Sequence, residues 1–252
     1  MAALAPTRRG IWRRRKGKLL EGLCFTAALL GCGILLIILG YITSKGIGAI
    51  NVDFFIHIPR PTGETGGGVS NAIVGTGMMI LIAAGIAIPI GVMAGTYLAE
   101  FGRGRFAYFV RLLADVMTGI PSIVVGILVY QLIVIRMHHF SAWAGGIALA
   151  TLMLPTIVRT SEEILRLVPK EYTEAALGLG VARWRTIVSI VFPSAMGGLV
   201  TGIMLALARA SGETAPLLFT ALGNQLWSTD PNQPMAALPM SLIVPKGPPT
   251  TK

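Results

Sequence analysis

The stretch EAALGLGVARWRTIVSIVFP, residues 174–193, lies largely within a polar island, Arg159–Thr186, between two hydrophobic parts of the chain. Gly178 and Gly180 permit a sharp turn after a short helix, and Trp184 then resumes an apolar stripe that leads into Phe192-Pro193. A polar loop with two short helices around a glycine, set in a hydrophobic chain, is suited to engage another component. The sequence therefore predicts a contact site here.

The composition is that of a membrane protein. Of the 252 residues, 54% are hydrophobic and 13% charged, with a mean hydropathy of +0.72, which leaves too few charges to cover a water-soluble globule. A bilayer core of about 30 Å needs roughly 20 apolar residues per helix. Five stretches are candidates: Leu19–Thr43, Ala72–Ala99, Leu112–Ile135, Ala142–Val158 and Ser194–Phe219. We predict an all-α, polytopic membrane helix bundle.

The 21 basic residues, which give a formal net charge of +10, are distributed unevenly about these spans. Lys45, Arg60 and Arg136 lie on one side, with Lys246 and Lys252 if there are five spans. Fifteen lie on the other: Arg8, Arg9, Arg13, Arg14, Arg15, Lys16, Lys18, Arg103, Arg105, Arg111, Arg159, Arg166, Lys170, Arg183 and Arg185. This asymmetry predicts a cytoplasmic N-terminus and a cytoplasmic polar island. Nucleic-acid binding by the basic N-terminal run is the weaker alternative.

These assignments give the organisation of the chain. They are a basic cytoplasmic tail at 1–18, a first transmembrane helix at 19–43, a periplasmic loop at 44–71, a core at 72–240 that contains the island within 159–193, and a short tail at 241–252. The first span is longer than a signal-peptide core and no clear cleavage pattern follows it, so we expect an uncleaved anchor. Cys24 and Cys32 lie in that span, too far apart for a disulfide.

Several features of the core have both a structural and a functional interpretation. The glycines and alanines of the second span predict close helix packing. Pro121 predicts a kink in the third span, and with Asp115 it serves either packing or a transport pathway. In the island, Thr160–Glu163 marks a helix end or start, and Tyr172–Leu179 predicts an amphipathic helix with Ala175, Ala176 and Leu179 near one face. A membrane-surface helix pair that merely joins two spans is an equal alternative.

Arg209 and Glu213 form a charged pair near the middle of the last predicted span. A charge at mid-bilayer costs roughly 2.5–3.5 kcal/mol on insertion scales, so such residues point to function. One alternative is an ion pair within the helix that neutralises itself. The other, which we favour, is a polar pathway in which Arg209 meets an oxyanion such as phosphate or carboxylate, with Ser211 and Thr214 beside it.

Enzyme motifs are absent from the sequence. It contains no phosphate-binding loop of the G-x4-G-K-[ST] type, no H-E-x-x-H, no paired-cysteine metal spacing and no G-x-S-x-G. We therefore expect no catalytic residue, no metal and no ATP hydrolysis by this chain.

The pattern Glu174-Ala175-Ala176-x3-Gly180-x9-Ile190-x-Phe192-Pro193 resembles the EAA motif of ABC-importer permeases, with Phe192 where leucine is usual. Three further segments resemble the phosphate-specific, PstA-type branch of that family. They are GGGVSNAIVGT at 66–76, TGIPSIV at 118–124 and ARASGETAPLL at 208–218. The resemblance covers roughly Arg15 to Met240.

The resemblance implies a six-helix permease of the MetI-like type I importer fold, of which five spans are visible. It also implies a homologous permease subunit, two separate ATPase subunits that use ATP and magnesium, and a periplasmic phosphate-binding protein as partners in the inner membrane. This chain would bind no cofactor. The island would be the coupling helix seated on an ATPase, through Glu174, Ala175, Ala176, Gly180, Ile190 and Pro193. Arg209 and Glu213 match family residues important for phosphate passage.

The C-terminal residues depart from the family pattern, because the eight residues from Pro245 to Lys252 cannot form a sixth span. We expect a truncation or frameshift as the simplest explanation. Three alternatives to phosphate import stay open: a permease for another oxyanion or small solute, an ion-coupled carrier that works without ATP, and an inactive truncated permease.

Overall fold

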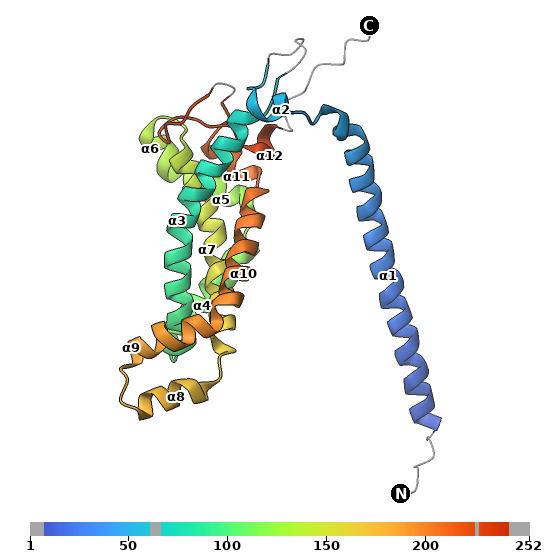
Figure 1. Ribbon diagram of the computed structural model, residues 1–252, viewed down its shortest axis with the longest axis vertical. Coiled ribbons are helices and arrows are strands. Elements are labelled where there is room, and N and C mark those ends of the chain that lie inside the picture. The colour runs from blue at the N-terminus through green and yellow to red at the C-terminus, as the bar shows by residue number, and fades with distance from the viewer. Residues whose placement is uncertain (1–7, 61–66, 225–226, 242–252) are drawn as a thin grey trace, which may run out of the picture. The chain divides into compact units, whose positions relative to one another are not determined.

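A computed structural model describes residues 8–60, 67–224 and 227–241, and the regular secondary structure of these residues is helical, with no strand among them (Figure 1). The chain divides into two compact units, Met1–Val52 and Asp53–Lys252. The predicted all-α class is confirmed.

The first unit consists mainly of α1, Arg8–Gly46, followed by the short 3-10 helix Ile47–Ala49. The apolar side chains of α1 are exposed within this chain, as shown by Ile37 at 72%, which suits a helix surrounded by lipid. The helix begins well before the predicted position 19, because arginine and lysine favour helix and no proline interrupts the run. Cys24 and Cys32 are free thiols.

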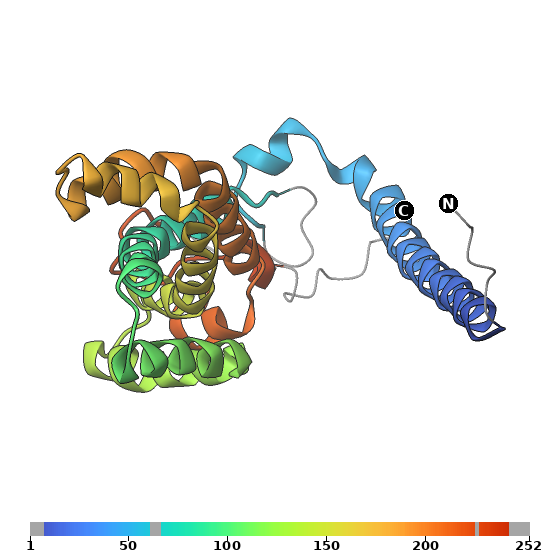
Figure 2. The same cartoon turned by 90° about the horizontal axis from the view of Figure 1, so that it is seen from below.

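The second unit is a helix bundle with α7 in its middle (Figure 2). Its α-helices are α2 (Val52–Ile56), α3 (Ser70–Glu100), α4 (Arg105–Gly119), α5 (Ser122–Val129), α6 (Ile135–Met137), α7 (Ala142–Arg166), α8 (Lys170–Gly178), α9 (Arg183–Thr186), α10 (Phe192–Ser211), α11 (Ala215–Thr220) and α12 (Leu238–Ser241). Two π-helical turns, Tyr130–Val134 and Ile187–Val191, complete it. The main core lies between α3, α7, α10 and α11.

Small residues bring α3 and α7 together, as predicted. A Cβ on Gly91 would lie 2.7 Å from Ile157 Cγ2, and a Cβ on Gly95 would lie 2.5 Å from the Cβ of Ser161. Gly77 and Gly85, on the same helix, have open space around them instead. Close approach of helix backbones maximises van der Waals contact, which drives helix association in lipid.

Four helices of the described residues are long and apolar enough to cross a membrane: Lys16–Gly46, Ser70–Glu100, Ala142–Arg166 and Arg183–Ser211. A fifth candidate is a broken pair, Arg105–Gly119 and Ser122–Met137, which bends by 103°. The sequence predicts one kinked helix here. The break at the proline is confirmed, but the bend is so large that the segment forms two separate helices. Ile120, which precedes Pro121, is extended with ψ 131, because a proline disfavours the helical conformation of the residue before it.

Two predicted span ends also differ from the structure. The fourth span does not stop at Val158 but continues as α7 to Arg166, so Thr160–Glu163 is helix interior and not a helix end. The last span does not run to Phe219, since α10 ends at Ser211 and α11 begins only at Ala215. The predicted tail at 241–252 lies outside the described residues from position 242 onward.

Candidate functional site

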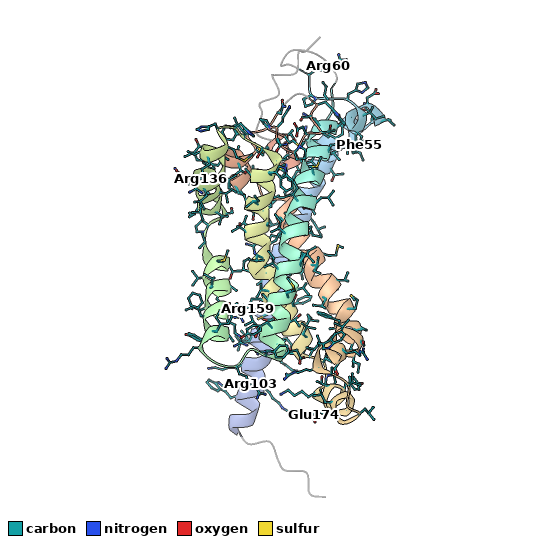
Figure 3. All side chains as sticks on the ribbon, turned by 90° about the vertical axis from the view of Figure 1, so that its left-hand side faces the viewer. Phe55, Arg60, Arg103, Arg136, Arg159 and Glu174 are labelled. Atoms are coloured by element: carbon teal, nitrogen blue, oxygen red, sulfur yellow. The ribbon has the colours of Figure 1, made fainter. Side chains whose placement is uncertain are left out.

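The polar island lies at one end of the second unit. Figure 3 shows Glu174 at the same end as Arg103 and Arg159, whereas Arg60 and Arg136 lie at the opposite end. Within this unit, the charge asymmetry of the sequence is therefore an asymmetry in space. The island itself is shorter than predicted, because its first residues belong to α7 and it begins after Arg166.

A glycine-dependent cap ends α8. The Gly180 N–H donates to Leu177 O at 2.9 Å and the Val181 N–H donates to Ala176 O at 3.1 Å, the two hydrogen bonds of a Schellman motif. Gly180 has φ +80, a left-handed conformation that other residues rarely adopt. Gly178 is an ordinary helical residue. The fixed glycine of the motif is thus explained by the turn that it makes.

The predicted apolar face of this helix is only partly confirmed. Ala176 is buried, whereas Ala175 and Glu174 are exposed and Leu179 is 85% exposed. Leu179 follows the last residue of α8 as its C-cap, so it no longer obeys the helical period. Leu167, Tyr172, Leu179 and Trp184 are all more than half exposed, and they give the outer surface of the island apolar side chains that a partner can cover.

The second half of the motif leads directly into a span. Ile190 is half-buried in the π-helical turn, and Pro193 follows that turn as the second residue of α10. Val191 is buried against Leu165, Ala195 and Leu199. The motif therefore combines an exposed first half with a second half that is anchored in the bundle.

Arg209 and Glu213 lie at a helix end and not near the middle of a span, which corrects the prediction. Arg209 is in the last turn of α10, and Glu213 is in the break before α11, where its N–H donates to Ala210 O at 3.2 Å. No ion pair between them occurs in the part of the chain that the structure describes. The alternative of a self-neutralising pair within one helix is therefore not what the structure contains.

Both side chains instead line one small, open hollow between α7 and α10. Leu152, Met153 and Thr156 of α7 form one wall, and Ala206 and Ala210 of α10 lie beside Arg209. Arg209 is exposed and Glu213 half-buried. Because Glu213 does not pair with the Arg209 guanidinium, the N–H groups of Arg209 are available to bind an oxyanion.

The other two predicted pathway residues lie nearby but contribute less directly. Ser211 Oγ donates to Ala208 O at 2.8 Å, on its own helix. Thr214 is the residue before α11, with no capping hydrogen bond from its side chain. Neither lines the hollow. The structure thus brings together Arg209 and Glu213 and leaves Ser211 and Thr214 at its margin.

A buried charge network at the island end of the bundle was not predicted from the sequence. Glu162, 2% exposed, accepts from Arg111 Nε at 2.6 Å and pairs with Arg166 at 2.7 Å and Arg159 at 3.5 Å. Arg159 also donates to both carboxylate oxygens of Asp115 at 2.8 Å. Asp115 therefore joins α4 to α7, which supports its structural interpretation. The spacing in the sequence could have indicated it. Glu162 follows the apolar Val158 by four residues, so both lie on one face of α7, and that face is buried.

Metal binding has no support from these residues. The described part of the chain contains no group of three or more histidine, cysteine, aspartate or glutamate side chains that could hold a metal ion.

Comparison with known proteins identifies relatives of this arrangement. The family described as "Binding-protein-dependent transport system inner membrane component" matches residues 87–244. The chain is 46% identical, over 92% of its length and 79% of the relative's, to "Phosphate transport system permease protein PstA" of Yersinia pestis. It is 45% identical to the protein of the same name from Haemophilus influenzae, over 91% of this chain and 81% of the relative.

A solved structure described as "Inward facing conformations of the MetNI methionine ABC transporter" is also similar. The likeness has a TM-score of 0.48 and 20% identity, and it covers 56% of this chain and 67% of that chain.

Proposed function

The chain belongs to the family of binding-protein-dependent transport system inner membrane components, and within it to the PstA phosphate transport permeases, and on that premise we propose that it forms part of the path by which inorganic phosphate enters the cytoplasm. It is a transport subunit of an ABC transporter in a membrane. We assign it to the inner membrane, with a cytoplasmic N-terminus. Energy comes from ATP hydrolysis on separate subunits.

The observation that carries the pathway assignment is the hollow between α7 and α10. Arg209 presents an exposed guanidinium there, and Glu213 lines the same space without neutralising it. Arginine matches the oxygen geometry of phosphate better than a point charge does. A phosphate ion would gain charge-assisted hydrogen bonds from Arg209.

The likeness to ABC-importer permeases supports the proposed partners, and the exposed surfaces offer places for them. A homologous permease subunit would cover the open side of the hollow, and a periplasmic phosphate-binding protein would deliver the substrate. Two ATPase subunits would contact the island through the surface that carries Glu174, Ala175 and Gly180, all exposed. Buried Ala176, half-buried Ile190 and Pro193 at the start of α10 would hold the motif to the bundle. The cofactors of transport, ATP and magnesium, would then bind those subunits and not this chain.

The proposal is tested by uptake of radioactive phosphate into proteoliposomes that hold this chain with its partner permease and ATPases. Uptake should require the binding protein and ATP, and sulfate should not compete. ATP-driven uptake of another oxyanion would show that the cargo assignment is wrong. Phosphate uptake that persists without any ATPase subunit would instead identify an ion-coupled carrier.

A further inference from the structure

Arg183, three residues beyond the cap glycine of the island, contacts the end of another span. Its Nη2 donates to the backbone oxygen of Glu100 at 2.7 Å and lies 3.8 Å from Glu100 Oε2. Its guanidinium carbon lies 4.5 Å from the ring centroid of Phe101. Glu100 is the last residue of α3 and Phe101 is its C-cap. A single side chain thus joins α9 to α3 by a hydrogen bond, an ion pair and a cation–π contact.

The contact continues into α4 through aromatic rings. The ring of Phe101 is stacked on that of Tyr97 at 6.4 Å, and Tyr97 meets Phe106 edge to face at 5.8 Å. Phe106 lies in the first turn of α4. We call residues 97–106 the α3–α4 corner. It links Arg183 to the beginning of the broken span.

The α3–α4 corner is also fastened to α7. Arg111 donates to the backbone oxygens of Leu98 at 3.0 Å and Gly102 at 3.1 Å, while its Nε holds Glu162. Through Arg111 of α4, these hydrogen bonds tie the corner to both α4 and α7. Thr156, six residues before Glu162 on α7, lines the hollow that contains Arg209.

The direct covalent connection from α9 to α10 is not a regular α-helix. Ile187–Val191 is a π-helical turn, in which each hydrogen bond spans one residue more than in an α-helix. Such turns are rare and often mark functional sites.

We propose that Arg183 is a positioning residue that transmits movement of the island to the α3–α4 corner, and from there to α7 and the hollow. The side chain acts through Glu100 and Phe101 and touches no substrate. This inference rests on the proposed function, since it assumes that a partner moves the island. It predicts that loss of the contact leaves ATP hydrolysis intact and lowers phosphate uptake per ATP.

The test uses the complete complex with its partner permease and ATPases, reconstituted in proteoliposomes. Arg183→Ala should keep the ATPases bound and hydrolysing ATP while phosphate uptake per ATP falls about tenfold or more, which corresponds to about 1.4 kcal/mol of lost coupling. Arg183→Lys keeps the charge and one hydrogen bond but loses the planar contact with Phe101, and should be intermediate. Arg185→Ala is the matched control, because that guanidinium lies 5.5 Å from the ring of Trp184 on its own helix.

The outcomes are distinguishable from failure of the proposed function, which would show as no phosphate uptake by the wild-type complex. Unchanged uptake per ATP in Arg183→Ala would overturn the inference. Loss of ATPase co-purification in both Arg183 variants would also overturn it, because Arg183 would then be a docking residue. If Arg183→Ala does not assemble, Phe101→Leu tests the same contact from the other side and should lower uptake per ATP.

Discussion

Arg111 on α4 and Glu162 on α7 form an ion pair 2.6 Å long in which the Glu162 side chain is only 3% exposed. Residues 159 and 166 add two further arginines to the same carboxylate. Buried charges are tolerated only when they are paired and hydrogen-bonded. Glu162 is therefore the centre of the charge network that holds this end of the bundle together.

Glu162→Gln should destabilise the protein strongly, because it leaves three arginines without their shared carboxylate. Removing one partner of a buried pair costs about 3–5 kcal/mol. Thermal unfolding of the purified complex in detergent measures this loss. Glu163→Gln, an exposed neighbour on the same helix, is the control and should unfold like the wild type. Equal stability of the two variants would show that Glu162 is not the centre of the network.

Gly180→Ala should weaken attachment of the ATPase subunits. The added Cβ has open space around it, so the cost is that of a left-handed backbone, roughly 1–2 kcal/mol. The cap of α8 loosens as a result, while membrane insertion stays normal. Gly178→Ala, helical and also in open space, should leave attachment intact. Co-purification of the ATPases checks both variants, and a similar loss in both would rule out a role for the cap.

Arg209→Gln should abolish phosphate uptake while the complex still assembles. Its neutral side chain removes the guanidinium from the hollow without altering the buried faces of α10. Arg209→Lys keeps the charge but lacks the fork that binds two oxygens, so we expect partial uptake. Uptake assays beside size-exclusion profiles of the complex provide the measurement. Normal uptake by Arg209→Gln would remove the pathway role.

Gly95→Ala should destabilise the packing of α3 on α7. The new Cβ would lie 2.5 Å from the Cβ of Ser161 and 2.8 Å from Val158 O, and overpacking of this kind costs about 1–3 kcal/mol. Gly85→Ala is the control on the same helix, because nothing lies within 4 Å of its Cβ. Comparison of the two unfolding temperatures tests the close approach. An unfolding temperature of Gly85→Ala below that of Gly95→Ala would contradict the close approach of α3 and α7.

The prediction from sequence was most successful where a property depends on neighbouring residues. Runs of apolar residues located the spans, and the small residues of the second span indicated its packing against another helix. The spacing from Glu174 to Pro193 located a capped helix that leads into a span. The sequence predicts helix ends less well: it ends the fourth span at Val158, whereas the pairing of Arg159 with Asp115 allows α7 to continue to Arg166.

The sequence alone determined that this chain is an all-α membrane protein with an exposed polar island, because hydrophobicity and turn chemistry are local. Only the tertiary structure decided that Arg209 and Glu213 share a hollow without pairing, and that Arg111 reaches Glu162 across 51 residues of chain. The contact of Arg183 with Glu100 spans 83 residues. Such contacts depend on how whole helices pack, and each long side chain can reach several partners until that packing selects one.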